Sequence, residues 1–239
     1  MPKAFLIKKF LVMDLETYNL NGKLIPYAVS IYNGHKYHFF YLTDYENSTQ
    51  MLIAAIKTLM LRRYHGYKVY LHNFSNFDGI FLINILNELS ENISIKRHND
   101  KFIEIKFLFN AGKYKLYFRD SLLMLPVSLR KLALQFNVGG KGIFPYDFVN
   151  SNNLDYTGPV PDIKYFSDIS EIEYMIYCDD FKYVAWDLRR ETEKYCVQDC
   201  VTLYQVLDKF FNENFSVTRV NASKDPSLSS LALANYNFY

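Results

Sequence analysis

The sequence predicts a three-layer α/β domain in which a mixed β-sheet is flanked by helices. Two observations carry this prediction. Short apolar segments at positions 10–13, 27–32 and 36–42 come first in the chain, as expected for strands. Segments with helical periodicity then alternate with further strand-like segments. The chain has 239 residues, 50% of them hydrophobic, and can therefore bury a substantial core as one domain or one and a half.

The second and third strands are joined by a turn at Asn33-Gly34, a favourable hairpin sequence. Apolar residues recur at helical intervals from 49 to 64, which predicts a helix there. The elements expected next are a buried strand at 68–71, a turn at 72–79, a helix containing Ile80 and Leu86, a hairpin of strands 93–109 and 113–118, a helix at 128–136, a loop-rich stretch at 138–162 and a long helix from about Ala185 to Phe211. This order, β-β-β-α-β-α with a long final helix, fits a ribonuclease H-like fold.

The composition places weak limits on function. A formal net charge of +2 does not identify a nucleic-acid-binding protein, so a DNA groove has to be a local basic patch. The 21 Tyr and 20 Phe either fill the core or stack on bases of a single strand. Together with abundant Asn and an excess of Lys over Arg, they favour A/T-rich codons, which suggests an organellar (mitochondrial) or plasmid-like genome.

The three cysteines form no disulfide framework, which fits a reducing compartment. Cys196 and Cys200 lie four residues apart, but no His or Cys pair nearby completes a zinc site. The apolar stretches are too short for a signal peptide or a membrane span, so we expect a soluble protein without a membrane partner.

Acidic residues follow the first strand. Asp14 and Glu16 lie on the same face by strand alternation, about 6–7 Å apart along the chain. Two carboxylates in this register can hold hard divalent cations, although a solvated strand end is the simpler alternative.

Two further acidic positions follow later elements. Asp78 comes after a loop that contains Asn73 and Phe77, at the start of a helix, where a carboxylate can cap backbone amides without any metal. Tyr195 and Asp199 are four residues apart and therefore neighbours on a helix, with Cβ atoms about 5–6 Å apart. Each of the three acidic clusters is uninformative alone, so the evidence for a functional site lies in their order and spacing.

The three clusters together resemble the three exonuclease motifs of family B DNA polymerases, in the tyrosine branch of the four-carboxylate exonucleases. The resemblance covers roughly residues 10–211. Three features are similar to the protein-primed group: Thr17 after Glu16, the segment Ser121-Leu122-Leu123-Met124-Leu125, and the segment Lys141-Gly142-Ile143-Phe144. The loop between Asn73 and Phe77 is about one residue longer than in the viral members of that group.

This resemblance implies a domain division. Residues 1–215 are expected to form the exonuclease domain, and residues 216–239 the start of a polymerase segment or a C-terminal tail, because 227–232 resembles the beginning of that family's polymerase domain. The polymerase motifs Asp-x-x-Ser-Leu-Tyr-Pro and Tyr-x-Asp-Thr-Asp are absent from the chain. The chain alone is therefore not expected to synthesise DNA, and a polymerase domain in the same natural chain is the expected partner.

The resemblance also implies residue roles. The expected ligands of two divalent ions, Mg²⁺ or Mn²⁺, are Asp14, Glu16, Asp78 and Asp199. Tyr195 is expected to orient the attacking water, because its reference pKa near 10 makes it a poor base. Lys141 would offset charge on the scissile phosphate. The single-stranded 3′ end of DNA would be held by Thr17, Asn73, Phe77, Ser121 and Leu122.

Physical reasoning supports the metal assignment independently. Each contact between like charges costs about 4 kcal/mol at 4 Å and an effective dielectric constant of 20, so four clustered carboxylates require cations. Two such ions commonly activate a water and stabilise the leaving oxygen. Two other functions stay open: trimming of RNA by the same fold, and a non-catalytic, polymerase-derived subunit of a larger assembly.

Overall fold

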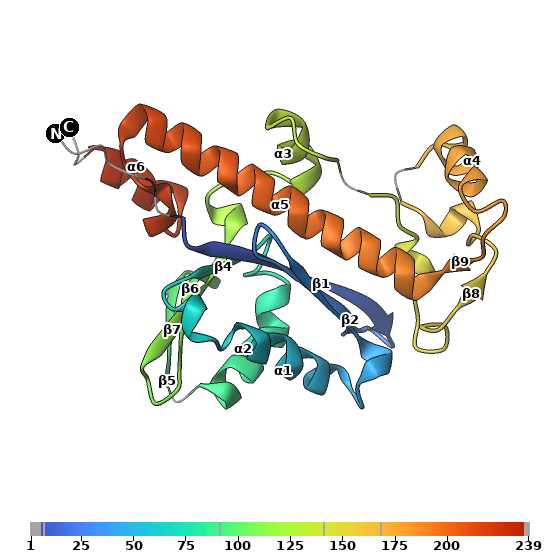
Figure 1. Ribbon diagram of the computed structural model, residues 1–239, viewed down its shortest axis with the longest axis horizontal. Helices are drawn as coiled ribbons and strands as arrows, with labels where there is room; N and C mark the ends of the chain where they lie inside the picture. The colour runs from blue at the N-terminus through green and yellow to red at the C-terminus, as the bar shows by residue number, and fades with distance from the viewer. Residues whose placement is uncertain (1–5, 7, 91, 141, 168, 237–239) are drawn as a thin grey trace.

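The computed structural model describes residue 6 and residues 8–90, 92–140, 142–167 and 169–236. A seven-stranded sheet lies between two layers of helices (Figure 1). The strands are β1 (Phe10–Leu20), β2 (Lys23–Tyr32), β3 (Tyr37–Tyr41), β4 (Lys68–Leu71), β5 (Asn92–His98), β6 (Lys101–Phe109) and β7 (Tyr114–Asp120). Their order in the sheet is β3-β2-β1-β4-β7-β6-β5. The central strands β1, β4 and β7 run parallel, whereas the outer pairs are antiparallel.

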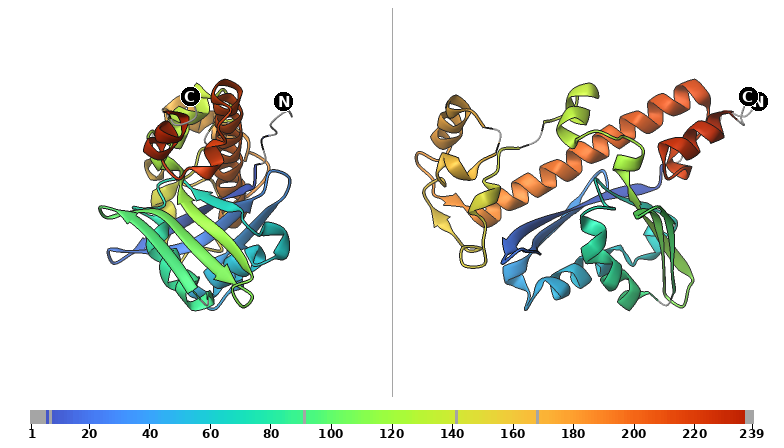
Figure 2. Two further views of the ribbon diagram at one scale, coloured as in Figure 1. Left: turned by 90° about the vertical axis from the view of Figure 1, so that its left-hand side faces the viewer. Right: turned by 180° about the vertical axis from the view of Figure 1, so that it is seen from behind.

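Two helices, α1 (Ser48–Leu59) and α2 (Asp78–Leu89), cover one face of the sheet, and the long helix α5 (Leu188–Thr218) crosses the other face (Figure 2). Three shorter helices are α3 (Leu129–Gln135), α4 (Glu171–Asp179) and α6 (Leu228–Tyr236). A small lobe contains α4 and the two-residue strands β8 (Thr157–Gly158) and β9 (Trp186–Asp187). Among the described residues, every helix is too short or too polar to cross a membrane.

The alternation of side chains along β1 assigns each residue to one helical layer. Leu11, Met13 and Leu15 belong to the apolar core under α1 and α2. Phe10 and Val12 belong to a second core under α5. Because successive strand residues point to opposite faces, Asp14 continues the α5 side of the strand.

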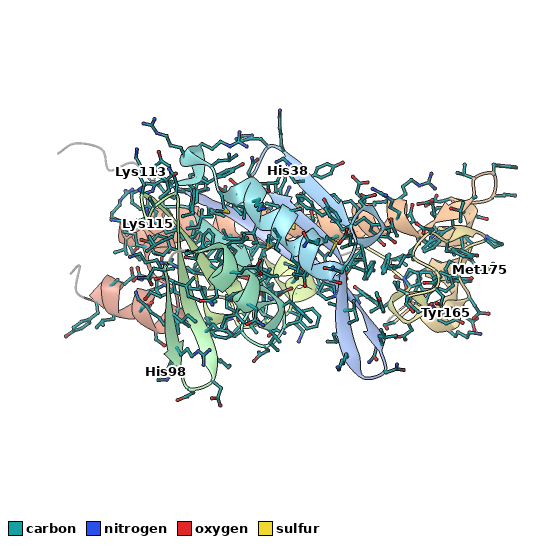
Figure 3. The ribbon with its side chains drawn as sticks, turned by 90° about the horizontal axis from the view of Figure 1, so that it is seen from below. His38, His98, Lys113, Lys115, Tyr165 and Met175 are labelled. Carbon is teal, nitrogen blue, oxygen red and sulfur yellow. The ribbon has the colours of Figure 1, made fainter. Side chains whose placement is uncertain are left out.

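The lobe around α4 and the β5–β6 and β6–β7 turns lie at opposite ends of the molecule. Tyr165 and Met175 mark the lobe, and His98, Lys113 and Lys115 mark the turns (Figure 3). The basic turn residues therefore lie far from the lobe.

The predicted order of elements is confirmed, and several boundaries were wrong. The first strand continues to Leu20, because β2 pairs with it along that whole length, so Asp14 and Glu16 lie inside the strand rather than at its end. The segment 93–109 is two strands rather than one. The chain reverses between them at Asn99, whose φ of 51° is left-handed. The turn lies in the polar run 96–101, whose Asn99-Asp100 is a turn signal that the prediction overlooked.

Two helices also differ from prediction. The first helix ends at Leu59 instead of residue 64, because Leu61 is already extended. The last helix runs from Leu188 to Thr218 and ends where Arg219 adopts a left-handed φ of 61°. Helix α4 was not predicted at all.

A buried ion pair fixes the C-terminal segment to the sheet. Arg119 on β7 and Glu104 on β6 are both buried, and the guanidinium lies 2.6 Å from the carboxylate. The same guanidinium donates hydrogen bonds to the backbone oxygens of Ser223, at 2.9 Å, and Lys224, at 3.2 Å. Helix α5 runs past residue 215 without interruption, so the predicted boundary at 215/216 does not coincide with a structural break.

We expect the substitution Arg119→Met to lower the free energy of unfolding by about 3 kcal/mol or more, because Glu104 would stay buried without its main partner. Urea unfolding measures this change. Arg189→Met is the matched control, since its ion pair with Asp44 is half-exposed and contributes about 1 kcal/mol at most. Equal effects of the two variants would contradict the structural role given to Arg119.

Candidate functional site

The candidate site forms where the three parallel strands end. Strand β1 pairs with β4 only from Phe10 to Val12, and then continues beyond the end of its neighbour. Asp14 therefore lies just past the last parallel pair, beside the loops that follow β4 and β7. Ligands of α/β sheets commonly bind outside the carboxyl ends of the strands.

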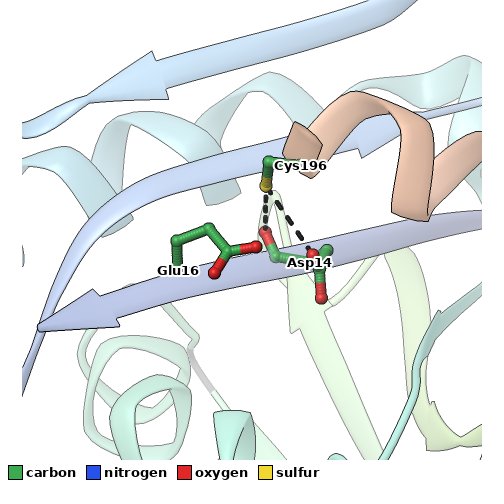
Figure 4. A group of neighbouring side chains, drawn as sticks. All are labelled: Asp14, Glu16 and Cys196. Carbon is green, nitrogen blue, oxygen red and sulfur yellow. Dashed lines mark hydrogen bonds between the residues drawn. The ribbon is translucent and has the colours of Figure 1, made fainter. Parts of the chain in front are cut away.

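Asp14 and Glu16 face α5, where they meet Cys196 (Figure 4). One ligand-type atom of each residue lies within 4.8 Å of the others. The Cys196 Sγ is 3.6 Å from the backbone oxygen of Asp14 and 3.7 Å from its Oδ2. Burial, followed by the charges of Asp14 and Glu16, raises the pKa of the Cys196 thiol well above its usual value. The thiol is therefore a neutral neighbour of the carboxylates.

Asp78 is the first residue of α2 and is almost fully buried. Burial and then the charge of Asp14 raise the pKa of Asp78 well above its usual value, against the lowering effect of a backbone hydrogen bond. Its Oδ1 is buried and has no hydrogen-bond partner among the described residues. A helix start alone therefore does not account for this carboxylate.

The third cluster lies on α5. Burial, followed by the charges of Asp199 and Glu16, raises the pKa of Tyr195 far above its ordinary value, so its hydroxyl stays protonated. This hydroxyl is hydrogen-bonded to the hydroxyl of Tyr146, and the ring of Phe144 packs 5.1 Å from the ring of Tyr195. Tyr195 is thus a fixed hydrogen-bonding group beside the carboxylates.

A cleft of about 830 Å³ opens onto this cluster. Four of the predicted site residues line it: Asp14, Asn73, Leu122 and Asp199. Further lining residues come from three places: the turn and helix around α3 (Ser128, Leu129, Arg130), the segment 142–146 (Gly142, Ile143, Phe144, Tyr146), and the α4 lobe (Ser167, Ile169, Glu173). His72 completes the lining. The structure therefore brings the three predicted motifs to one cavity.

Asp120, at the end of β7, organises the walls of the cleft. Its carboxylate accepts hydrogen bonds from the backbone N–H groups of Asn73, at 3.0 Å, Ser75, at 2.9 Å, and Leu122, at 2.9 Å. Asn73 has a left-handed φ of 69°, which this anchoring holds in place. One buried carboxylate thus fixes the loops after both β4 and β7.

The other predicted strand-binding residues have different surroundings. Ser121 is fully buried, and its Oγ lies 2.9 Å from His72 Nδ1 and 3.1 Å from the backbone oxygen of Leu71. Its hydroxyl therefore positions His72, while the neighbouring Leu122 lines the cleft. Phe77 is half-buried against Phe81, with ring centroids 5.7 Å apart.

Two predicted residues remain. Thr17 is half-buried at a β-bulge directly after Glu16. Lys141 lies outside the described residues; the next residue, Gly142, lines the cleft.

Sequence reasoning missed three residues of the site: Asp120, Tyr146 and Cys196. Asp120 directly precedes the Ser121-Leu122 motif, and this position could have drawn attention to it. Tyr146 lies in an irregular segment without periodicity, and Cys196 reaches the carboxylates only through the packing of α5 on β1. These two were detectable only in three dimensions.

The residues present fit divalent metal ions. The donors that cluster are hard carboxylate oxygens, which suit Mg²⁺ and Mn²⁺. The buried Oδ1 of Asp78 supplies a further oxygen beside Asp14. Asp14, Glu16, Asp78 and Asp199 are therefore the residues that would hold such ions.

We expect Asp78→Asn to raise the midpoint of thermal unfolding at pH 8 in the presence of EDTA. The raised pKa means that the folded state binds the proton more tightly than the unfolded chain, so ionisation of Asp78 destabilises the fold as the pH rises. The gain should shrink as the pH falls and vanish below about pH 3, where Asp78 is protonated in both states.

Asp100→Asn, at an exposed turn, is the control and should change the midpoint little at either pH. A wild-type protein more stable than Asp78→Asn at pH 8 in EDTA would show that Asp78 is not under electrostatic strain.

Comparisons with known proteins agree with this geometry. Residues 58–238 match the family described as DNA polymerase type B, organellar and viral. A probable DNA polymerase of Neurospora intermedia is 39% identical over an alignment that covers 95% of this chain and 26% of that protein. A probable DNA polymerase of Ascobolus immersus is 35% identical over an alignment that covers 97% of this chain and 20% of that protein. The chain thus spans about a quarter or less of the length of these relatives.

Solved structures show the same fold. Phi29 DNA polymerase complexed with single-stranded DNA superposes with a TM-score of 0.55 at 18% identity, covering 87% of this chain and 32% of that chain. The ternary complex of Phi29 DNA polymerase with primer-template DNA and incoming nucleotide superposes with a TM-score of 0.52 and covers the same fractions of the two chains. The predicted α/β, ribonuclease H-like fold is therefore confirmed.

Proposed function

Because the chain belongs to the organellar and viral type B DNA polymerases, we propose that it is the metal-dependent 3′→5′ exonuclease domain of such a polymerase. The observation that supports this most is the single cleft lined by Asp14 and Asp199, with Glu16 and Asp78 beside it. The reaction is hydrolysis of the terminal phosphodiester of a single-stranded or mispaired DNA end, with release of nucleoside 5′-monophosphates.

The four carboxylates would hold two divalent ions, and such ions would supply positive charge for activating a water and for offsetting the charge of the leaving oxygen. Tyr195, kept protonated by its buried surroundings, donates its hydroxyl hydrogen bond toward the attacking water. The hydroxyl of Tyr146 fixes the orientation of Tyr195. Lys141 offsets charge on the scissile phosphate, as its motif implies.

The strand is held by the walls that Asp120 anchors. Asn73 and Leu122 line the cleft and contact the terminal nucleotides. Phe77 stacks on a base, a contact that contributes about 1–3 kcal/mol and tolerates any sequence. Thr17 and Ser121 support this binding surface from β1 and from the start of the turn after β7.

The remainder of the polymerase is the proposed partner. The relatives are several times longer than this chain, and the segment 219–236 packs against the sheet through Arg119. We assign residues 1–215 to the exonuclease domain and residues 216–239 to the transition toward a polymerase domain. The family description fits replication in an organelle or in a virus.

We expect the double variant Asp14→Ala/Glu16→Ala to lose hydrolysis of a 5′-labelled single-stranded DNA by at least about a thousandfold. A single preorganised charge-stabilising group contributes about 10²–10³ to rate, and this variant removes two metal ligands. Binding of the same oligonucleotide in EDTA should persist, since the strand-binding walls are unchanged.

Asp179→Ala/Asp180→Ala is the matched control, because it removes two exposed carboxylates at the end of α4, outside the cleft. It should hydrolyse DNA like the wild type. Wild-type rates in the Asp14/Glu16 variant would refute the proposed function.

Two measurements separate this function from the other candidates. Calorimetric titration with Mn²⁺ should show binding that is lost in Asp14→Ala/Glu16→Ala, whereas a non-catalytic subunit would show none. Matched DNA and RNA oligonucleotides should be cleaved at different rates, with DNA faster. A preference for RNA would assign the domain to RNA trimming.

A further inference from the structure

The charges around the cleft are distributed unevenly. Its lining includes the carboxylates of Asp14, Asp199 and Glu173. Among the described residues that line it, Arg130 on α3 is the only Lys or Arg. A phosphate backbone that enters the cleft therefore meets a largely acidic surface, and Arg130 is its most evident point of attraction.

Arg130 is available for a ligand. Its side chain is exposed, and it makes no hydrogen bond or ion pair with any residue in the described part of the chain. An arginine guanidinium presents a planar set of donors that suits phosphate oxygens. Within the described part of the chain, the donors of this guanidinium are thus left for a ligand.

Glu173 lies on another wall of the same cleft and is fixed in place. Its Oε2 accepts hydrogen bonds from the backbone N–H of Ser170, at 2.9 Å, and from the Ser170 hydroxyl, at 2.7 Å, in a capping box at the start of α4. These bonds lower the pKa of Glu173; burial opposes them, and the charge of Arg130 adds a smaller lowering effect. Arg130 and Glu173 thus face one cleft from two separate helices, and Figure 1 shows α3 and α4 on the same side of the sheet as α5.

We propose that Arg130 binds a backbone phosphate of the single strand entering the cleft, and that Glu173 weakens this contact by attracting the same guanidinium. This inference rests on the proposed function, because it names a phosphate-binding position of that site. The two residues act with opposite sign on the same ligand. Their balance sets how tightly the cleft retains a strand, and hence how readily an unpaired end is exchanged.

The test measures binding of a fluorescent oligothymidylate by anisotropy in EDTA, where no hydrolysis interferes. Arg130→Gln should weaken binding about two- to fivefold, the size expected for one exposed charge pair. It should also lower the salt dependence by about 0.7 in the slope of log affinity against log salt, the value for one phosphate contact with a single strand.

Lys131→Gln is the matched control. Lys131 is the next residue of α3, is exposed and does not line the cleft, so its replacement should leave affinity and slope unchanged. Equal losses in Arg130→Gln and Lys131→Gln would overturn the inference, because the effect would then reflect general charge.

Glu173→Gln should bind the oligonucleotide about twofold more tightly, because Gln preserves the capping box but removes the charge. The gain should disappear in Arg130→Gln/Glu173→Gln, since Glu173 acts through Arg130. A full gain in the double variant would overturn the competition between the two residues.

The outcome is distinguishable from the proposed function. Hydrolysis by the wild type, combined with unchanged binding in Arg130→Gln, would overturn this inference and leave the exonuclease intact. Absence of hydrolysis, combined with the expected binding changes, would support the phosphate-binding position and refute the catalytic proposal.

Discussion

Helix α5 packs along the face of the sheet that carries Phe10 and Val12, and this packing decides where the acidic residues meet. Alternation along β1 puts Asp14 on the face of these apolar residues. On α5, Cys200 and Leu203 belong to the shared core, and the preceding turn presents Tyr195, Cys196 and Asp199. The side chains that recur every two residues along the strand therefore meet those that recur about every four residues along the helix.

The same packing creates an electrostatic strain that the fold alone does not remove. Asp78 is buried near Asp14, and its pKa is raised, as expected where carboxylates approach each other out of water. The neutral thiol of Cys196 fills space beside Asp14 without adding charge. Because buried charges require compensation, the divalent cations proposed for this site would relieve the strain.

The sequence was sufficient to predict the fold, from periodicity and the order of elements, and the convergence of the three motifs, from their resemblance to those of family B DNA polymerases. It was insufficient for Tyr146 and for the lobe around α4, which depend on long-range contacts. Ser121 illustrates the same limit at one residue: its motif predicts DNA binding, yet its hydroxyl is buried against His72 and Leu71. The turn at Asn99, by contrast, lies in the polar run 96–101 and could have been predicted from the sequence. Local patterns identify which residues belong together, whereas packing decides which atoms are exposed.

Strand β7 connects the site with the C-terminal segment. Its last two residues point to opposite faces, because successive strand side chains alternate. Arg119 holds the segment after α5 through the backbone oxygens of Ser223 and Lys224, and Asp120 holds the loops of the cleft through three backbone N–H groups. Neighbouring residues of one strand thus anchor both the C-terminal segment and the walls of the cleft, so the two share the same support in the sheet.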